Sequence, residues 1–125
     1  MKETRVFTGA PWEKKVGYCR AIRKGSFIAV SGTTAPGDSM YKQSQGCFQI
    51  IEKALKELGS SLQDVVRTRI FTTDITKWEE IARAHFEAVG AHPPAASMYQ
   101  ISALIDPKLL VEIEVDAIMT APTQK

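Results

Sequence analysis

The chain has 125 residues, of which 44% are hydrophobic and 24% are charged, a composition typical of a globular protein and not of a disordered or collagen-like chain. The net charge of +2, from 16 Lys and Arg against 14 Asp and Glu, argues against a strongly basic nucleic-acid surface. This length predicts a single domain over residues 1–125.

Three features restrict the compartment and the metal chemistry. No apolar run reaches the roughly 20 residues of a membrane span, and the N-terminus lacks the apolar stretch of a signal peptide, so we expect a cytoplasmic protein without membrane contact. Cys19 and Cys47 match no zinc or redox spacing and are expected to be reduced thiols. His85 and His92 have no carboxylate at ligand spacing, so we predict no metal site.

The first part of the chain is predicted to consist of strands and turns. A short strand at residues 4–8 is broken by residues 9–12, which contain Gly and Pro. Residues 18–23 alternate weakly, and after a tight turn residues 27–30 form a continuous apolar run, typical of a strand buried on both faces. Residues 31–37 are predicted to be a loop.

Two helices are predicted from the spacing of their apolar residues. Residues 40–58 place apolar side chains at i, i+3, i+4 and i+7, and Gly59 ends this helix. A strand over residues 65–73 follows, and residues 76–79 (Thr-Lys-Trp-Glu) form a capping box that opens a second helix, which closes at Gly90. The predicted inner face of the second helix consists of Trp78, Ile81, Ala82, His85 and Val89.

Two further strands and a tail complete the prediction. Residues 97–104 form a strand after the extended Pro93-Pro94 pair, and residues 111–119 form a strand in which acidic and apolar residues alternate. The last residues, 121–125, are expected to fray. Strands interrupted by two helices predict an α+β fold, a mixed sheet of about six strands with both helices on one face.

Several predicted strands carry apolar residues on both faces, for example Phe27 beside Ile28 and Tyr99 beside Met98. Two helices can cover only one face of such a sheet, and an uncovered apolar face of this size is rare on a soluble monomer. The sequence therefore predicts a closed homo-oligomer that packs these faces together, with ligand clefts between subunits.

Charged side chains share one face of two predicted strands. Glu112, Glu114 and Asp116 follow one another about 6.5–7 Å apart, and they suit either paired acid/base chemistry or a solvated, salt-bridged face. Arg67 and Arg69 share a face of the strand over residues 65–73. They either pair with these acids or hold an anionic ligand.

Four segments follow one another along most of the chain, at residues 17–21, 28–35, 64–75 and 106–114. The last two, which contain Val-Val-Arg-Thr-Arg-Ile-Phe and Leu-Val-Glu-Ile-Glu, are the more specific. Together the segments resemble the Rid/YjgF family of reactive intermediate deaminases, also labelled endoribonuclease L-PSP or translation initiation inhibitors. The resemblance implies a chorismate-mutase-like fold and a homotrimer with a small-molecule cleft between each pair of subunits.

The resemblance also implies an activity, the hydrolysis of reactive enamines and imines such as 2-aminoacrylate to keto acids and ammonia, without a cofactor. Transferred position by position, it implies that Glu112 is the catalytic residue that assists a water molecule. It further implies that Tyr18 lines the cleft and that Ser31 and Gly32 close its other side.

One functional residue of the family does not transfer. The arginine that grips the substrate carboxylate falls on Ala96, which Ser97 follows on the same wall of the cleft. Such a charged contact contributes about 1.5–3 kcal/mol, so we expect weak activity on 2-aminoacrylate unless Arg69 or Arg83 takes over from another wall.

Two other functions stay open. The missing arginine favours a ligand-binding or sensing protein without turnover. The family's labels suggest RNA cleavage or translation inhibition. The net charge of +2 and the absence of a conventional histidine-based nuclease pair argue against a nucleic-acid partner. The expected partners are other copies of the chain and a small-molecule ligand.

Overall fold

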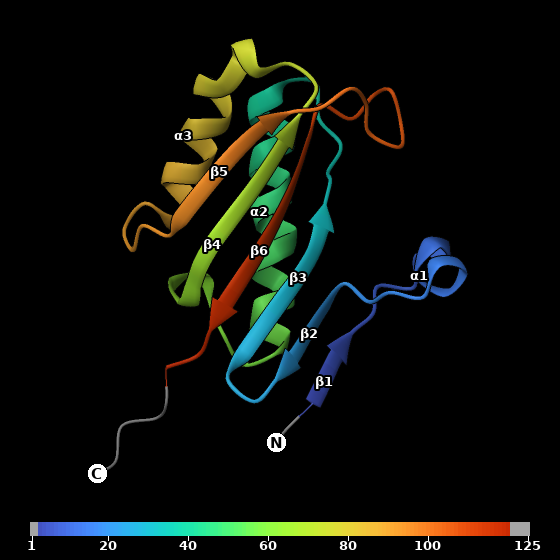
Figure 1. Cartoon of the computed structure of the whole chain (residues 1–125), viewed down its shortest axis with the longest axis vertical. Helices are drawn as coiled ribbons and strands as arrows, with labels where there is room; N and C mark the ends of the chain where they lie inside the picture. The colour runs from blue at the N-terminus through green and yellow to red at the C-terminus, as the bar shows by residue number, and fades with distance from the viewer. Residues whose placement is uncertain (1–2, 121–125) are drawn as a thin grey trace.

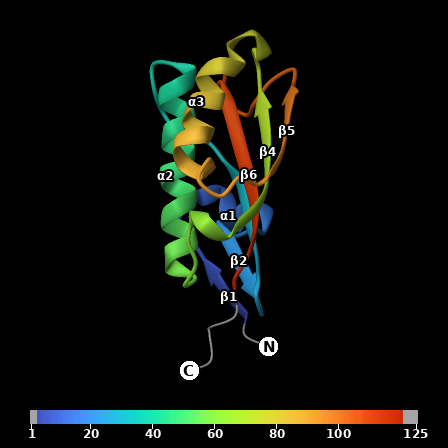
Figure 2. The same cartoon turned by 90° about the vertical axis from the view of Figure 1, so that its left-hand side faces the viewer.

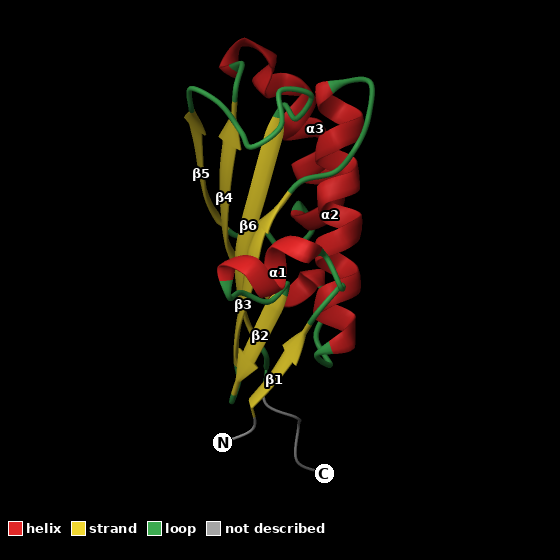
Figure 3. Cartoon of the chain, turned by 90° about the vertical axis from the view of Figure 1, so that its right-hand side faces the viewer, coloured by secondary structure: helices red, strands yellow, loops and turns green. Residues whose placement is uncertain are grey.

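The computed structural model describes residues 3–120 and forms two layers, a six-stranded sheet and a pair of helices on one of its faces (Figures 1 and 2). Figure 3 shows the same layers from the opposite side, and Figure 1 shows that α1 lies apart from the helix pair. No helix among the described residues is long and apolar enough to cross a membrane. In chain order the elements are β1 (Glu3–Val6), α1 (Pro11–Val16), β2 (Ala21–Lys24), β3 (Phe27–Thr33), α2 (Met40–Glu57), β4 (Val65–Thr72), α3 (Trp78–Val89), β5 (Ala95–Gln100) and β6 (Val111–Ile118).

The sheet has the order β1-β2-β3-β6-β4-β5. All neighbouring strands are antiparallel except β4 and β5, which run parallel and are joined through α3. The predicted α+β fold, a mixed sheet with two helices on one face, is confirmed. Strand β6 is the last of the described strands in sequence, but it lies in the middle of the sheet, between β3 and β4. Its side chains therefore have neighbouring strands on both sides.

The alternation along β6 divides the protein into a core face and an open face. Val111, Ile113, Val115 and Ala117 are at most 1% exposed and face the helices, as predicted. The acidic residues between them are half-buried on the opposite face, which no helix covers. We use the name open face for this side of the sheet below.

Helix α2 begins where Ser39 accepts a hydrogen bond from the Lys42 backbone N–H, and it closely matches the predicted residues 40–58. Its predicted apolar face is buried against the sheet, with Ile51 and Leu55 both 0% exposed. The apolar spacing was sufficient to predict this helix because the residues buried against the sheet recur with the helical period along its whole length.

The prediction that residues 9–12 only break a strand is wrong, because a helix, α1, begins at Pro11. Proline is compatible with the first turn of a helix, and Gly17 ends the helix in the left-handed conformation with φ 88°. The buried carboxylate of Glu13 accepts hydrogen bonds from the backbone N–H groups of Thr8 and Gly9. These bonds fold the segment back on itself beside the β1–β2 edge of the sheet (Figure 1).

The capping box predicted at residues 76–79 is also wrong. Asp74 accepts a hydrogen bond from the Thr76 N–H and starts a 3₁₀ turn at Ile75–Lys77, and α3 continues from that turn. The prediction that Trp78 lies on the inner face of this helix is wrong, because Trp78 is the first residue of α3 and is 52% exposed. Ile81 and Val89 are buried as predicted.

Smaller corrections concern element ends. Strand β3 continues through Thr33 and so includes the first residues of the predicted loop 31–37. Strand β5 begins at Ala95, directly after the two prolines, and not at residue 97. The prediction that residues 121–125 fray concerns residues outside those described.

Candidate functional site

The candidate site is centred on a bulge in β3 beside the start of β6. Val30 pairs with Val115 and Thr33 pairs with Ile113, so β3 has one more residue than β6 in this interval. The extra residue lies in the Ser31–Gly32 segment that the sequence singled out. A Cβ atom at Gly32 would lie 2.8 Å from Cδ of Glu112, too close for a real contact. The absence of a side chain at Gly32 therefore leaves the space in which the Glu112 carboxylate rests.

Two side-chain hydrogen bonds hold this bulge against the residues that precede β2. The Ser31 hydroxyl donates to the Cys19 carbonyl over 2.7 Å, and Nη2 of Arg20 donates to the Gly32 carbonyl over 2.8 Å. The Arg20 guanidinium lies 5.9 Å from the centre of the Tyr18 ring. Four residues that the sequence assigned to one site, Tyr18, Ser31, Gly32 and Glu112, are thus connected through Arg20.

The surroundings of Glu112 change its acidity. Half-burial is the largest cause that raises the pKa of the Glu112 carboxyl, and the neighbouring charge of Glu114 raises it further. The positive charge of Arg20 opposes both effects. A carboxyl with a raised pKa can accept a proton from water and return it in a later step, so this arrangement suits general acid/base chemistry.

Arg69, one of the proposed replacements for the missing arginine, is ion-paired on the open face. Its Nη1 lies 3.2 Å from Asp116 and 3.8 Å from Glu114, so of the two alternatives for the arginines of this strand, Arg69 follows the pairing with acids. Phe71, opposite Glu112 in the register, stacks on Tyr99 with ring centres 5.8 Å apart. Arg69 thus lies on the same face as Glu112, but Glu114 and Asp116 already compensate its positive charge.

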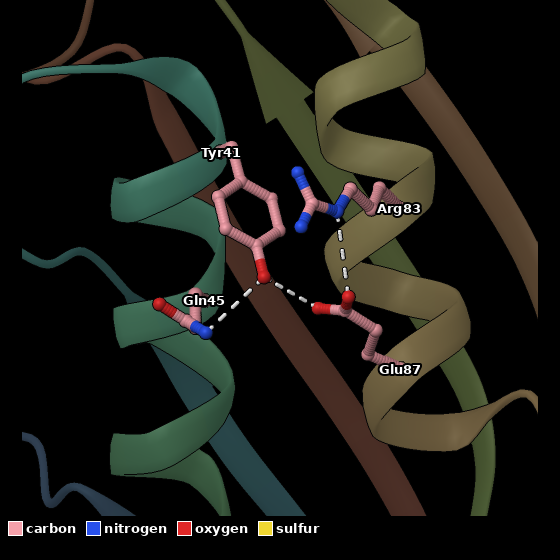
Figure 4. Close-up of polar contacts among 4 residues, drawn as sticks. All are labelled: Tyr41, Gln45, Arg83 and Glu87. Carbon is pink, nitrogen blue, oxygen red and sulfur yellow. Dashed lines mark hydrogen bonds and ion pairs between the residues drawn. The ribbon is translucent and has the colours of Figure 1, made fainter.

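Arg83, the other proposed replacement, lies in the helix layer and away from Glu112. Its guanidinium stacks 4.2 Å from the centre of the Tyr41 ring, and its Nε lies 3.4 Å from Glu87 (Figure 4). The Tyr41 hydroxyl donates to Glu87 over 2.6 Å and accepts from Gln45, so the four residues join α2 to α3. Within one chain the structure does not bring Arg83 to the candidate site.

Ala96 and Ser97 lie on β5, which is an edge strand and is separated from β6 by β4. They line a cavity of about 500 Å³ between β5 and α3, together with apolar residues such as Ile70 and Phe86. Phe86 is 74% exposed at this edge. Ala96 and Glu112 therefore do not belong to one site within a single chain.

A second cavity, of about 950 Å³, lies at the opposite edge of the sheet, beside α1. Tyr18 and Cys19 form part of its wall, with Phe7 and Lys14 among the other lining residues. Glu112 lines neither cavity. In one chain, Tyr18 and Ala96 therefore lie near opposite edges of the sheet, while Ser31, Gly32 and Glu112 lie on the central strands β3 and β6.

Cys47 and His85 are each hydrogen-bonded to a neighbouring group of the fold. Cys47 donates from its thiol to the Thr33 carbonyl, and burial raises the pKa of Cys47 to about 12, so it stays a protonated thiol. His85 lies 2.8 Å from the Thr68 hydroxyl, and burial lowers the pKa of its ring. Among residues 3–120, no three His, Cys, Asp or Glu side chains are grouped to hold a metal ion.

Arg20 is the site residue that the sequence assignment missed. It lies in the segment at residues 17–21, one of the four that resemble the family, but the resemblance implies no role for it. A usable signal was present, because pairing of Ala21 with Val30 across the predicted turn places Arg20 opposite Ser31. The hydrogen bond from the Ser31 backbone N–H to the Arg20 carbonyl confirms that register.

Gly32→Ala is expected to push the Glu112 carboxylate out of the bulge, because the new methyl group would occupy its place. Moved toward water, the carboxyl loses the burial that raises its pKa, so its titration midpoint should fall toward the ordinary value. Carbon-13 NMR of the side-chain carboxyl measures this midpoint. An unchanged Glu112 midpoint in Gly32→Ala would contradict the packing described.

Comparison with known proteins shows the family to which the chain belongs. A sequence profile of the family described as Endoribonuclease L-PSP matches residues 9–119. An uncharacterized protein of Streptomyces coelicolor is 32% identical over 120 residues, which are 90% of each chain. A RutC family protein of Pyrococcus abyssi is 30% identical over 112 residues, covering 81% of this chain and 86% of that protein.

A solved structure is more similar still. A Mycobacterium tuberculosis protein, described as a member of the highly conserved YjgF/YER057c/UK114 family, is 46% identical, with a TM-score of 0.93. The match covers 94% of this chain and 100% of that one.

Proposed function

Because the chain belongs to the Rid/YjgF family, described also as endoribonuclease L-PSP, we propose that it forms a homotrimer that hydrolyses reactive enamines and imines in clefts between subunits. The observation that supports this function best is the half-buried Glu112 carboxyl resting over Gly32, with its raised pKa. The products are a carbonyl compound and ammonia.

The open face of the sheet supports self-association. Phe27, Ile118 and Tyr99 lie on this face and are 46%, 49% and 51% exposed, and none of the described helices covers them. Association of subunits through this face would bury these apolar side chains. The two cavities lie at opposite edges of the sheet, so a head-to-tail ring brings the Tyr18 edge of one subunit to the Ala96 edge of the next. Such a ring assembles the divided site residues.

The proposed reaction is the addition of water to a C=N bond. The substrate reacts as the protonated imine, and Glu112, as the carboxylate, accepts a proton from a water molecule while the water oxygen bonds to the imine carbon and the C=N π electrons pass to the nitrogen. Glu112 then returns its proton to the nitrogen of the neutral carbinolamine, the C–N bond breaks with loss of ammonia, and the hydroxyl proton passes to solvent water as the carbonyl forms. Tyr18 and Ser31 supply polar contacts at the walls of the cleft.

An in-situ assay tests this function. An amino-acid or amine oxidase supplies an imine, and ammonia release is recorded with the protein and with buffer. We expect release above the buffer rate, and a rate equal to that of buffer with every imine offered would contradict the proposal. Heat-treated protein serves as the control for added amines.

A binding or sensing role is the second candidate, favoured by Ala96, which offers no charge to a substrate carboxylate. Saturable binding of a keto acid in the cleft, without turnover of the matching imine, would support that role over hydrolysis.

A further inference from the structure

Arg20 occupies a fixed place in the backbone. Its N–H donates to the Val6 carbonyl over 2.8 Å, and its carbonyl accepts from the Ser31 N–H over 2.9 Å. The residue is therefore held from both sides, at the junction of α1 and β2. A side chain that starts from so constrained a backbone position has few ways to move its guanidinium.

The guanidinium is partly buried but has no carboxylate in contact. Among the described residues no carboxylate oxygen lies within 4.0 Å of Arg20, whereas Arg69 contacts two. Nη2 donates to the Gly32 carbonyl, and Nε is buried without a hydrogen-bond partner in the described part of the chain. A partly buried cation that no carboxylate contacts is costly, and this cost favours a role for Arg20 in the site.

The positive charge of Arg20 affects the pKa of two carboxyl groups that it does not contact, those of Glu13 and Glu112. It lowers the pKa of Glu13, after the larger effect of the Thr8 hydroxyl bond, and it opposes the raised pKa of Glu112. The other titratable groups around Glu112 are Glu114 on its own strand and the Cys47 thiol on α2. The register places uncharged Phe71 opposite Glu112 on β4, and Arg69, also on β4, is compensated by Asp116 and Glu114.

Arg20 and Glu112 also meet the same residue. The guanidinium binds the carbonyl of Gly32, and the carboxylate rests where the side chain of Gly32 would be. A shift of the bulge therefore changes both contacts. A displacement of about 1 Å in a reacting group can lower a rate roughly 100-fold.

We propose that Arg20 is a positioning residue of the site, which fixes the Ser31–Gly32 bulge beneath Glu112 through its hydrogen bond to the Gly32 carbonyl and places a guanidinium on the residue over which the carboxylate rests. This inference rests on the proposed function for its effect on rate, but not for its effect on Glu112. Arg20 holds the base in place and does not itself touch the reacting atoms.

The test compares three variants by carbon-13 carboxyl NMR, with the Glu112 signal assigned from Glu112→Gln. Arg20→Gln removes the charge and should move the Glu112 titration midpoint to higher pH. Arg20→Lys keeps the charge and should leave the midpoint close to that of the unmodified protein. Arg67→Gln removes a cation from β4 at a register position four residues from Phe71, so it should leave the midpoint unchanged.

A Glu112 midpoint that does not move in Arg20→Gln, in protein that keeps a cooperative thermal transition, would overturn the proposal. If Arg20→Gln does not fold, Arg20→Lys decides, because loss of the guanidinium fork that binds the Gly32 carbonyl should lower imine hydrolysis roughly 10- to 100-fold. Unchanged hydrolysis in Arg20→Lys would overturn the positioning role. The NMR result is readable even if the protein hydrolyses no imine, so failure of the proposed function and failure of this inference are distinguishable.

Discussion

Glu112→Gln is expected to lower imine hydrolysis roughly 100- to 10,000-fold, the usual contribution of a general base. Glutamine has the same shape as glutamate and fits the space over Gly32, but its amide accepts no proton from water. The measurement is ammonia release from an imine formed in situ, with the fold checked by thermal unfolding. Because the substitution removes a half-buried carboxyl with a raised pKa, we expect no loss of stability at neutral pH.

Glu114→Gln is the matched control for this substitution. Glu114 lies two residues along the same strand, on the same face, and contacts Arg69 at 3.8 Å. Removing its charge should lower the Glu112 pKa and change the rate less than tenfold, roughly the effect of one pKa unit. Equal losses in the two variants would show that the negative charge of the face matters and that Glu112 has no special role.

Ala96→Arg is expected to create activity on carboxylated imines. Ala96 is exposed on the edge strand β5, where the structure leaves room for a longer side chain. A charge-assisted contact with a substrate carboxylate contributes about 1.5–3 kcal/mol, so kcat/KM for the imine of a 2-amino acid should rise roughly 10- to 150-fold. Hydrolysis of an imine without a carboxylate should stay within a few-fold of the parent rate.

Ala95→Arg controls for added charge at this edge. Ala95 is also exposed but alternates to the other face of β5, so its guanidinium would point away from the cavity at Ala96. Equal gains from both substitutions would indicate general electrostatic attraction. No gain from Ala96→Arg, in protein that forms the trimer, would contradict the placement of Ala96 in the substrate cleft.

The layers and the charged face could be predicted from the sequence because each depends on a local period. The alternation in residues 111–118 separates core from open face, and the apolar spacing in residues 40–57 places α2 on that core. The pairing of Arg69 with Glu114 and Asp116 followed once the two strands were neighbours.

Features that depend on single tertiary contacts escaped prediction. Helix α1 is only six residues long, and its fold-back depends on Glu13 binding the Thr8 and Gly9 N–H groups. The role of Arg20 depends on a bulge that exists only when β3 and β6 are paired. Neither leaves a periodic trace in the sequence.

Strands with apolar residues on both faces predict clefts between subunits, but they do not predict how the individual site residues are distributed. Glu112 and Ala96 lie on strands separated by β4, and the two cavities open at opposite edges of the sheet. In the proposed trimer such residues meet across a subunit boundary, and no local pattern in the sequence of one chain predicts which of them face each other.

The most direct test is the pH dependence of imine hydrolysis by the unmodified protein, recorded beside the carbon-13 titration of Glu112 and corrected for the buffer reaction at each pH. Burial and Glu114 raise the pKa of Glu112, so we predict that catalysis is lost as the pH falls through a midpoint above the ordinary glutamate value of about 4.3. The kinetic midpoint should coincide with the NMR midpoint. Imine hydrolysis above the buffer rate at pH values where the NMR titration shows Glu112 to be protonated would contradict its role as the base.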